Sequence, residues 1–208
     1  MKFEYILDGD AGWAAIIFEH NGVSLTYSIT ECFCDNITQL LFGILKITNK
    51  VQEKVYDADD ELAELYVEEE GVFKWHIDEE GSEAIFLFTL LEDKKNVKLQ
   101  ITELSGGTLS NHETEECVFD GNINLNELID CVLNSCSNIL NKYGILGYYR
   151  NFWHDFPVTG YLALKDYKEK KLAFEYVEET IFERVKKMNR TNIEDEVKYL
   201  ITPEENKL

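Results

Sequence analysis

The pattern of hydrophobic and polar residues is most regular between residues 13 and 48. Residues 23–30 alternate between a hydrophobic and a hydroxyl-bearing face, which is the period of a strand with one buried side. The run 13–18 is apolar on both faces and predicts a central, covered strand, and Asn21-Gly22 is typical of a two-residue hairpin turn. A helix should follow, capped by Asp35 or Asn36. Its apolar residues at helical spacing are Ile37, Leu40, Leu41, Ile44 and Leu45.

Further strands are predicted on both sides of this hairpin and helix. Residues 2–7, 72–78 and 97–104 alternate as strands with one buried face, and 115–119 give a weaker signal. Residues 83–91 are apolar on both sides, which predicts another central strand. Short turns link these neighbours in sequence, so they should form an antiparallel meander.

The second part of the chain has the pattern of helices. An apolar stripe runs over residues 125–140, Asn124 is placed to cap its start, and Tyr143-Gly144 should end it. Residues 158–168 and 192–201 predict two more helices. A further helix between these two is predicted from the spacing of Phe174, Val177, Ile181, Val185 and Met188.

This order of elements predicts an α+β fold. We expect one antiparallel sheet of about six to seven strands, formed by the N-terminal hairpin and the meander, with helices packed on one face. We expect residues 1–208 to form a single domain, because no linker-like tract interrupts them. Residues 1–121 should be mainly sheet with one helix, and residues 122–208 mainly helical.

Charge is the one compositional extreme. The chain has 20 basic and 40 acidic residues, a net charge of −20, and residues 1–130 hold 8 of the basic and 28 of the acidic side chains. A field of this sign disfavours binding to nucleic acid or to an anionic membrane. It favours a basic protein partner, or it serves solubility alone.

The sequence also predicts a cytoplasmic protein without a cofactor or a metal. No secretory leader is visible, the longest apolar run is far short of the roughly 20 residues of a membrane span, and the five cysteines are an odd number. The spacing Cys32-Phe33-Cys34 is not that of a zinc site, and the four histidines are scattered. Phosphate-binding glycine loops and nucleophile elbows are missing from the sequence. We therefore assign no catalytic residue.

Two stretches are candidates for binding a partner. One is an acidic segment without a basic residue, and its alternative interpretation is a solvated loop. The other is an aromatic patch at 148–156, and its alternative is a helix-to-helix connection whose rings fill the core. The candidate residues are Asp57, Asp59, Asp60, Glu61, Glu64, Glu68, Glu69 and Glu70 in the acidic segment, and Tyr148, Tyr149, Arg150 and Trp153 in the aromatic patch.

The hairpin and helix at the start, followed by Tyr143-Gly144, Gly147-Tyr148, Trp153 and Phe156-Pro157, resemble a set of small uncharacterised bacterial proteins. Some of these look like the immunity proteins that accompany polymorphic or contact-dependent toxins. The resemblance covers residues 1–168 and supplies no catalytic residue. It implies a cytoplasmic, non-enzymatic, acidic protein that could sequester a toxin domain.

Three functional hypotheses follow from the sequence. The leading one is a non-catalytic, acidic protein-binding module, with an immunity protein that neutralises a basic toxin or effector as its specific form. The second is a hydrolase-type enzyme whose site is assembled from residues far apart in the sequence. The third is a structural or regulatory subunit that forms a homodimer through a sheet edge or through the patch at 148–156.

Overall fold

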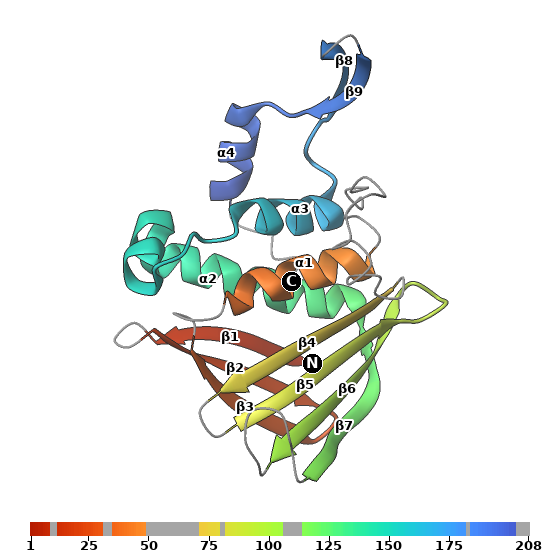
Figure 1. The fold of residues 1–208 in the computed structure, drawn as a ribbon, viewed down its shortest axis with the longest axis vertical. Helices are drawn as coiled ribbons and strands as arrows, with labels where there is room; N and C mark the ends of the chain where they lie inside the picture. Colours follow the sequence, from red (N-terminus) through yellow and green to blue (C-terminus); the bar gives the residue numbers. More distant parts are fainter. Residues whose placement is uncertain are drawn as a thin grey trace.

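The structure is a computed structural model that describes residues 1–8, 12–30, 35–48, 71–79, 82–105, 114–181 and 184–202. Strands dominate the first part of the chain and helices the second (Figure 1). The elements in order are β1 (Lys2–Asp8), β2 (Trp13–His20), β3 (Val23–Thr30), α1 (Asn36–Ile47), β4 (Val72–Glu79), β5 (Ser82–Leu90), β6 (Asn96–Ser105), β7 (Thr114–Asn124), α2 (Leu125–Phe152), α3 (Val158–Glu169), β8 (Glu175–Ile181), β9 (Arg184–Arg190) and α4 (Ile193–Ile201).

The α+β class is confirmed, but the prediction of a single large sheet was wrong. β1, β2 and β3 form one antiparallel sheet, and β4, β5, β6 and β7 form a second one, each in sequence order. The predicted hairpin and the predicted meander are therefore both present, in different sheets. The alternation of a strand identifies its buried face, but it does not identify what covers that face. Here the inner face of each sheet is covered by the other sheet and by helices.

Aromatic side chains join the inner faces of the two sheets. The rings of Phe18 on β2 and Phe119 on β7 have centroids 4.7 Å apart, and those of Tyr27 on β3 and Phe86 on β5 are 5.5 Å apart. The Tyr27 hydroxyl also donates a hydrogen bond of 2.9 Å to the Glu103 carboxylate. Burial, together with this carboxylate, raises the pKa of the Tyr27 hydroxyl. The phenol therefore stays protonated and holds β3 against β6.

Helix α1 lies between the two sheets and α3 (Figure 1). Eight of its twelve residues are buried, and the Asp35 carboxylate caps its start by accepting a 3.2 Å hydrogen bond from the Thr38 N–H. No side chain fits at Gly43, because an added Cβ would overlap the ring of Phe73 on β4. A Cβ at Gly160 of α3 would likewise crowd the side chains of α1. Glycines thus permit the close approach of α1 to both of its neighbours.

Helix α2 bends at the glycine that was predicted to end it. Gly144 has φ of 66° and ψ of 174°, which interrupts the helical geometry. A second helical segment follows and ends at Phe152, with Trp153 in the left-handed conformation as its C-cap. Residues 148–152, the first part of the aromatic patch at 148–156, are therefore helical. The predicted cap at the start is confirmed, because the Asn124 side chain accepts a 3.1 Å hydrogen bond from the Glu127 N–H.

Side chains of α2 cover the backbone edge of β1. The Tyr5 N–H donates a 3.0 Å hydrogen bond to the Ser135 hydroxyl, which in turn donates to the Cys131 carbonyl at 3.0 Å. Two residues further along β1, the Leu7 carbonyl accepts a 3.2 Å hydrogen bond from the Tyr143 hydroxyl. Edge strands must be protected from pairing with other chains. In this protein a helix provides that protection through its side chains.

The prediction of a helix over residues 174–188 was wrong, because this stretch forms the antiparallel hairpin β8–β9. Residues of opposite charge stand opposite each other in its register, with Glu178 across from Lys187 and Glu179 across from Lys186. Such cross-strand pairs favour a hairpin. Hydrophobic residues in this stretch recur four positions apart. Four is a multiple of the two-residue period of a strand, so this spacing fits a strand as well as a helix.

Helix α4 is attached to α3 through a buried lysine. Lys165 is 1% exposed, and its ammonium donates hydrogen bonds to the carbonyls of Tyr199 at 2.9 Å and Thr202 at 2.8 Å. A cation that binds the last carbonyls of a helix also interacts favourably with the helix dipole. Figure 1 shows α4 and the β8–β9 hairpin on the far side of α3 from the two sheets.

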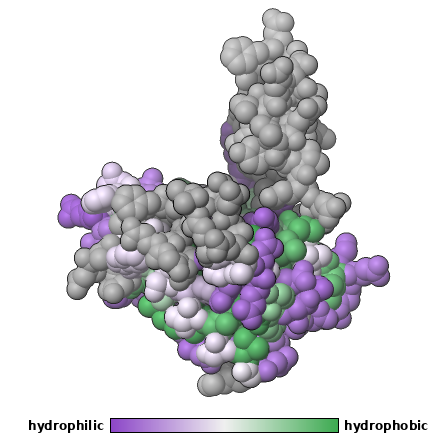
Figure 2. Space-filling model, turned by 60° about the horizontal axis from the view of Figure 1, so that its bottom comes forward, coloured by the Kyte–Doolittle hydropathy of each residue, from purple (hydrophilic) through white to green (hydrophobic). Residues whose placement is uncertain are grey.

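The outer sides of the sheets carry both hydrophobic and hydrophilic residues. β5 is central in its sheet, as predicted, but Ile85 and Leu87 on its outer face are only half-buried. Ile6 on the outer face of β1 is 45% exposed. Figure 2, turned so that the bottom of the view in Figure 1 comes forward, shows hydrophobic residues among hydrophilic ones on that side of the molecule.

Candidate functional site

The acidic segment proposed to bind a partner, from Asp57 to Glu70, lies outside the described residues. Its role stays a prediction from the sequence. The candidate site that can be built from contacts is therefore formed by α2, α3 and α4.

The structure divides the aromatic patch into buried and exposed residues. Tyr148 is fully buried, and its ring centroid lies 5.0 Å from that of Phe152, so it packs in the core. Tyr149 and Arg150 are exposed, and Trp153 is 74% exposed. Residues four apart share one face of a helix, which places Tyr148 with Phe152 inside and Tyr149 with Trp153 outside. Three of the four candidate residues in the patch can thus reach a partner directly.

Large apolar side chains are exposed on both the second segment of α2 and on α4. The α4 residues recur every four positions and form one stripe along the helix. The exposed residues of the two helices come together at one groove, which Ile145 and Ile201 both line. We call the seven exposed residues together the α2–α4 surface. The residues are Ile145, Leu146, Tyr149, Trp153, Ile193, Val197 and Ile201.

The groove between α2, α3 and α4 has a volume of about 440 Å³. Polar amide and hydroxyl side chains of α2 line one wall, and the C-terminal end of α4 lines the opposite wall. We call this hollow the asparagine groove. Its lining residues are Asn134, Ser137, Asn138, Leu140, Asn141, Gly144, Ile145, Tyr161, Leu200, Ile201 and Thr202.

Every residue that lines the asparagine groove is uncharged, although 29% of the chain is charged. Nearby, burial and the carboxylate of Glu169 raise the pKa of the Tyr199 phenol, which therefore stays neutral. The buried Lys165 is turned toward the carbonyls of α4. The groove thus offers amides, hydroxyls and apolar surface, which suits a neutral polar ligand with apolar parts.

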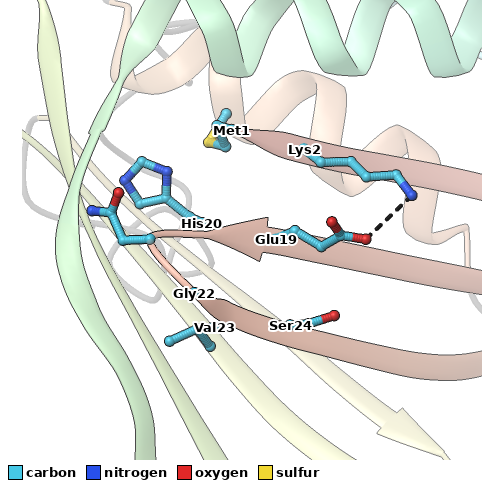
Figure 3. A pocket seen from close by; sticks show the side chains of 8 residues that line it. Met1, Lys2, Glu19, His20, Gly22, Val23 and Ser24 are labelled. Carbon is cyan, nitrogen blue, oxygen red and sulfur yellow. Dashed lines mark hydrogen bonds and ion pairs between the residues drawn. The ribbon is translucent and has the colours of Figure 1, made fainter.

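A second hollow, of about 460 Å³, lies beside the turn between β2 and β3. Figure 3 shows the side chain of Lys2 on β1 next to that of Glu19 on the neighbouring strand β2, and the two form an ion pair of 3.3 Å. Hydrogen bonds from Lys2 to Glu4 and Glu19 raise the pKa of its ammonium. Lys2, the lysine at this hollow, is therefore already paired with carboxylates, and the exposed turn residues Asn21 and Gly22 form part of the wall.

A polar contact also joins the end of α2 to the start of α1. The ring of His154, after α2, lies 3.7 Å from the carboxylate of Asp35, the cap of α1, and stacks edge-on against Tyr148. These contacts explain His154 as a structural group. Within the described ranges, no three or more His, Cys, Asp or Glu side chains are grouped closely enough to hold a metal ion.

Sequence reasoning missed the asparagine groove, although one signal for it was present. Asn134, Asn138 and Asn141 are spaced at four and three residues inside a segment that was predicted to be helical, so they share one face. Asparagine is a poor helix former, so helix propensity does not account for three of them on one face. The opposite wall, formed by α4, has no comparable signal in the sequence.

No helix in the described part of the chain combines the length and the apolar character that a membrane span requires. A comparison of the chain with protein-family models, curated proteins and solved structures finds no match.

Proposed function

We propose that this protein is a non-catalytic protein-binding module for a basic partner. The observation that carries the proposal is the α2–α4 surface, where seven large apolar side chains are exposed and two of them, Ile145 and Ile201, line an uncharged groove. Contiguous apolar surface on a folded protein marks sites of interaction. Tryptophan and tyrosine are also the residues that most often dominate the energy of an interface, and Trp153 and Tyr149 are both on this surface.

The net charge and the apolar surface have different roles in this proposal. A net charge of −20 accelerates the encounter with a basic partner over a distance, and this acceleration is screened by salt. The apolar contacts form only in the final complex, so they determine how slowly the partner dissociates. The resemblance to immunity proteins supports a toxin or effector domain as the partner.

The test uses the tagged full chain to capture a partner from the native host at low salt. Surface plasmon resonance then compares the wild type with Trp153→Asn at low and high salt. Asparagine tolerates the left-handed conformation that Trp153 adopts, with φ of 63°, so the variant should fold. The matched control is Ile6→Ser, which removes an exposed apolar side chain from β1 instead.

We expect Trp153→Asn to increase the dissociation rate about tenfold or more, as for a residue that dominates an interface. High salt should slow association of the wild type and the variant equally. Ile6→Ser should bind like the wild type. A partner that dissociates at the same rate from Trp153→Asn, or that associates equally fast at both salt concentrations, contradicts the proposal.

A further inference from the structure

We propose that the asparagine groove binds an extended peptide segment of the partner through the peptide backbone. This inference rests on the proposed function, since it names the part of a protein partner that enters the groove. Three features of the groove support it: the hydrogen bonding of the polar side chains on α2, the spacing of the asparagines along that helix, and the absence of charged residues from the lining.

The four polar side chains that α2 contributes to the groove make no hydrogen bonds to other described residues. Asn134, Ser137, Asn138 and Asn141 all lie on α2, and each is exposed or half-exposed. A carboxamide has two N–H donors and a carbonyl acceptor, so one asparagine can pair with both the N–H and the C=O of a peptide backbone. The wall therefore offers several complete sets of such groups to a ligand.

The spacing of the asparagines matches an extended chain. Asn134 and Asn138 are one helical step of four residues apart, a rise of about 6 Å along the helix axis. In an extended peptide, every second residue turns the same edge of its backbone to one side, at intervals of about 6.6 Å. Two asparagines on α2 can thus each pair with alternate residues of a peptide that runs along the helix.

The uncharged lining selects against other classes of ligand. A phosphate or a carboxylate would require a cationic group, and a cation would require carboxylates, but no lining residue supplies either. A sugar usually stacks on an exposed aromatic ring, whereas Tyr161, the aromatic residue in the lining, is 2% exposed. Ile145 and Ile201 flank the groove and are themselves exposed, so apolar side chains of a peptide can pack against them.

The test uses a library of blocked, synthetic hexapeptides with apolar residues at alternate positions. Binding to the full-length protein is measured by fluorescence anisotropy. The tightest peptide is then remade with N-methyl groups at either the odd or the even backbone nitrogens, which removes the donors on one edge at a time. The protein variants are Asn134→Ala and Asn138→Ala, and the control is Asn126→Ala, an exposed asparagine at the start of the same helix.

We expect each groove variant to weaken binding about tenfold, because it removes two hydrogen bonds to the peptide backbone. Asn126→Ala should have no effect. Alanine is a better helix former than asparagine, so the variants should remain folded. One of the two N-methylated peptides should lose binding and the other should keep it.

Several outcomes would overturn the inference. These are a library without a binding peptide, groove variants that bind like the wild type, equal effects of the two N-methylated peptides, and a neutral oligosaccharide such as cellopentaose bound in preference to peptides. The proposed function is tested separately by the captured partner. If dissociation of that partner depends on Trp153 but not on Asn138, the proposed function stands and the peptide inference fails.

Discussion

Replacing Ser135 with alanine tests how α2 protects the edge of β1. Ser135 is 5% exposed and accepts the hydrogen bond of the Tyr5 N–H at 3.0 Å. Alanine removes the acceptor and puts no other polar group in its place. An N–H that loses its partner in the interior costs about 1–3 kcal/mol in the free energy of unfolding.

The same substitution also stabilises helix α2, since the intrinsic helix propensity of alanine is more favourable than that of serine by about 0.5 kcal/mol. Ser137→Ala is the matched control for this gain, because Ser137 is two residues further along α2, half-exposed, and without a hydrogen bond to another described residue. The difference between the two variants therefore reports the loss of the buried Ser135 hydroxyl, which bonds both the Tyr5 N–H of β1 and the Cys131 carbonyl of its own helix. It should lower the midpoint of thermal unfolding of Ser135→Ala by about 2–12 °C relative to Ser137→Ala.

Thermal unfolding followed by circular dichroism gives the stability difference, and amide hydrogen exchange locates it. We expect the Tyr5 amide to exchange faster in Ser135→Ala than in the control, while the central strand β2 keeps its protection. If the two variants unfold at the same temperature and the Tyr5 amide exchanges at the same rate, side chains of α2 do not hold the edge of β1.

Three more predictions concern packing, a helix end and a turn. Gly43→Ala should destabilise the protein by about 1–3 kcal/mol despite the better helix propensity of alanine, because the new methyl group would displace the ring of Phe73; an unfolding midpoint at or above that of the wild type would contradict this. Lys165→Met keeps the aliphatic stem of the side chain but removes the donors to the last carbonyls of α4. Relative to the wild type, the hydrogen exchange of α4 amides should therefore accelerate more than that of α3 amides. Unchanged exchange in α4 would contradict the role of Lys165 as an anchor. The carboxylate of Asp93 accepts hydrogen bonds from the backbone N–H of Lys95 and from the next residue, which lowers its pKa. Its contribution to stability is therefore present above its ordinary pKa and is lost as the pH falls through the lowered value. NMR titration of the carboxyl group should show a pKa below 3.8, and an ordinary value would count against these bonds.

The strands could be predicted from the sequence because their periods are regular. Residues 23–30 alternate without interruption and form β3, and the cap at Asp35 marks the start of α1. Periodicity failed at residues 174–188, where a step of four residues fits both a helix and a strand. The residues between β8 and β9 in the sequence, Phe182-Glu183, also include no glycine, asparagine or proline, which usually indicate a hairpin. The division into two sheets could not be predicted, because alternation does not show which surface covers a strand.

The candidate site was predictable only in part. In the aromatic patch, Tyr149, Arg150 and Trp153 are exposed and Tyr148 is buried, and the sequence could not separate Tyr148 from Tyr149 before residues 145–152 were known to be helical. Whether the patch binds a partner stays a prediction. One wall of the groove is formed by α4, and Lys165 on α3 holds α4 in place by a hydrogen bond to its backbone. That contact joins residues 34 positions apart in the sequence, and no local pattern shows it.

The hydrogen bond between β1 and α2 also has a consequence for synthesis of the chain. Its two partners are 130 residues apart, so Tyr5 is made long before Ser135. At about 5–20 residues per second, the ribosome needs roughly 6–26 seconds to add the residues between them. During that interval β1 has no helix along its edge, and it can pair with strands of neighbouring nascent chains. Slow translation of residues 6–134 should therefore increase aggregation of the newly made protein, whereas chaperones that bind exposed strands should reduce it.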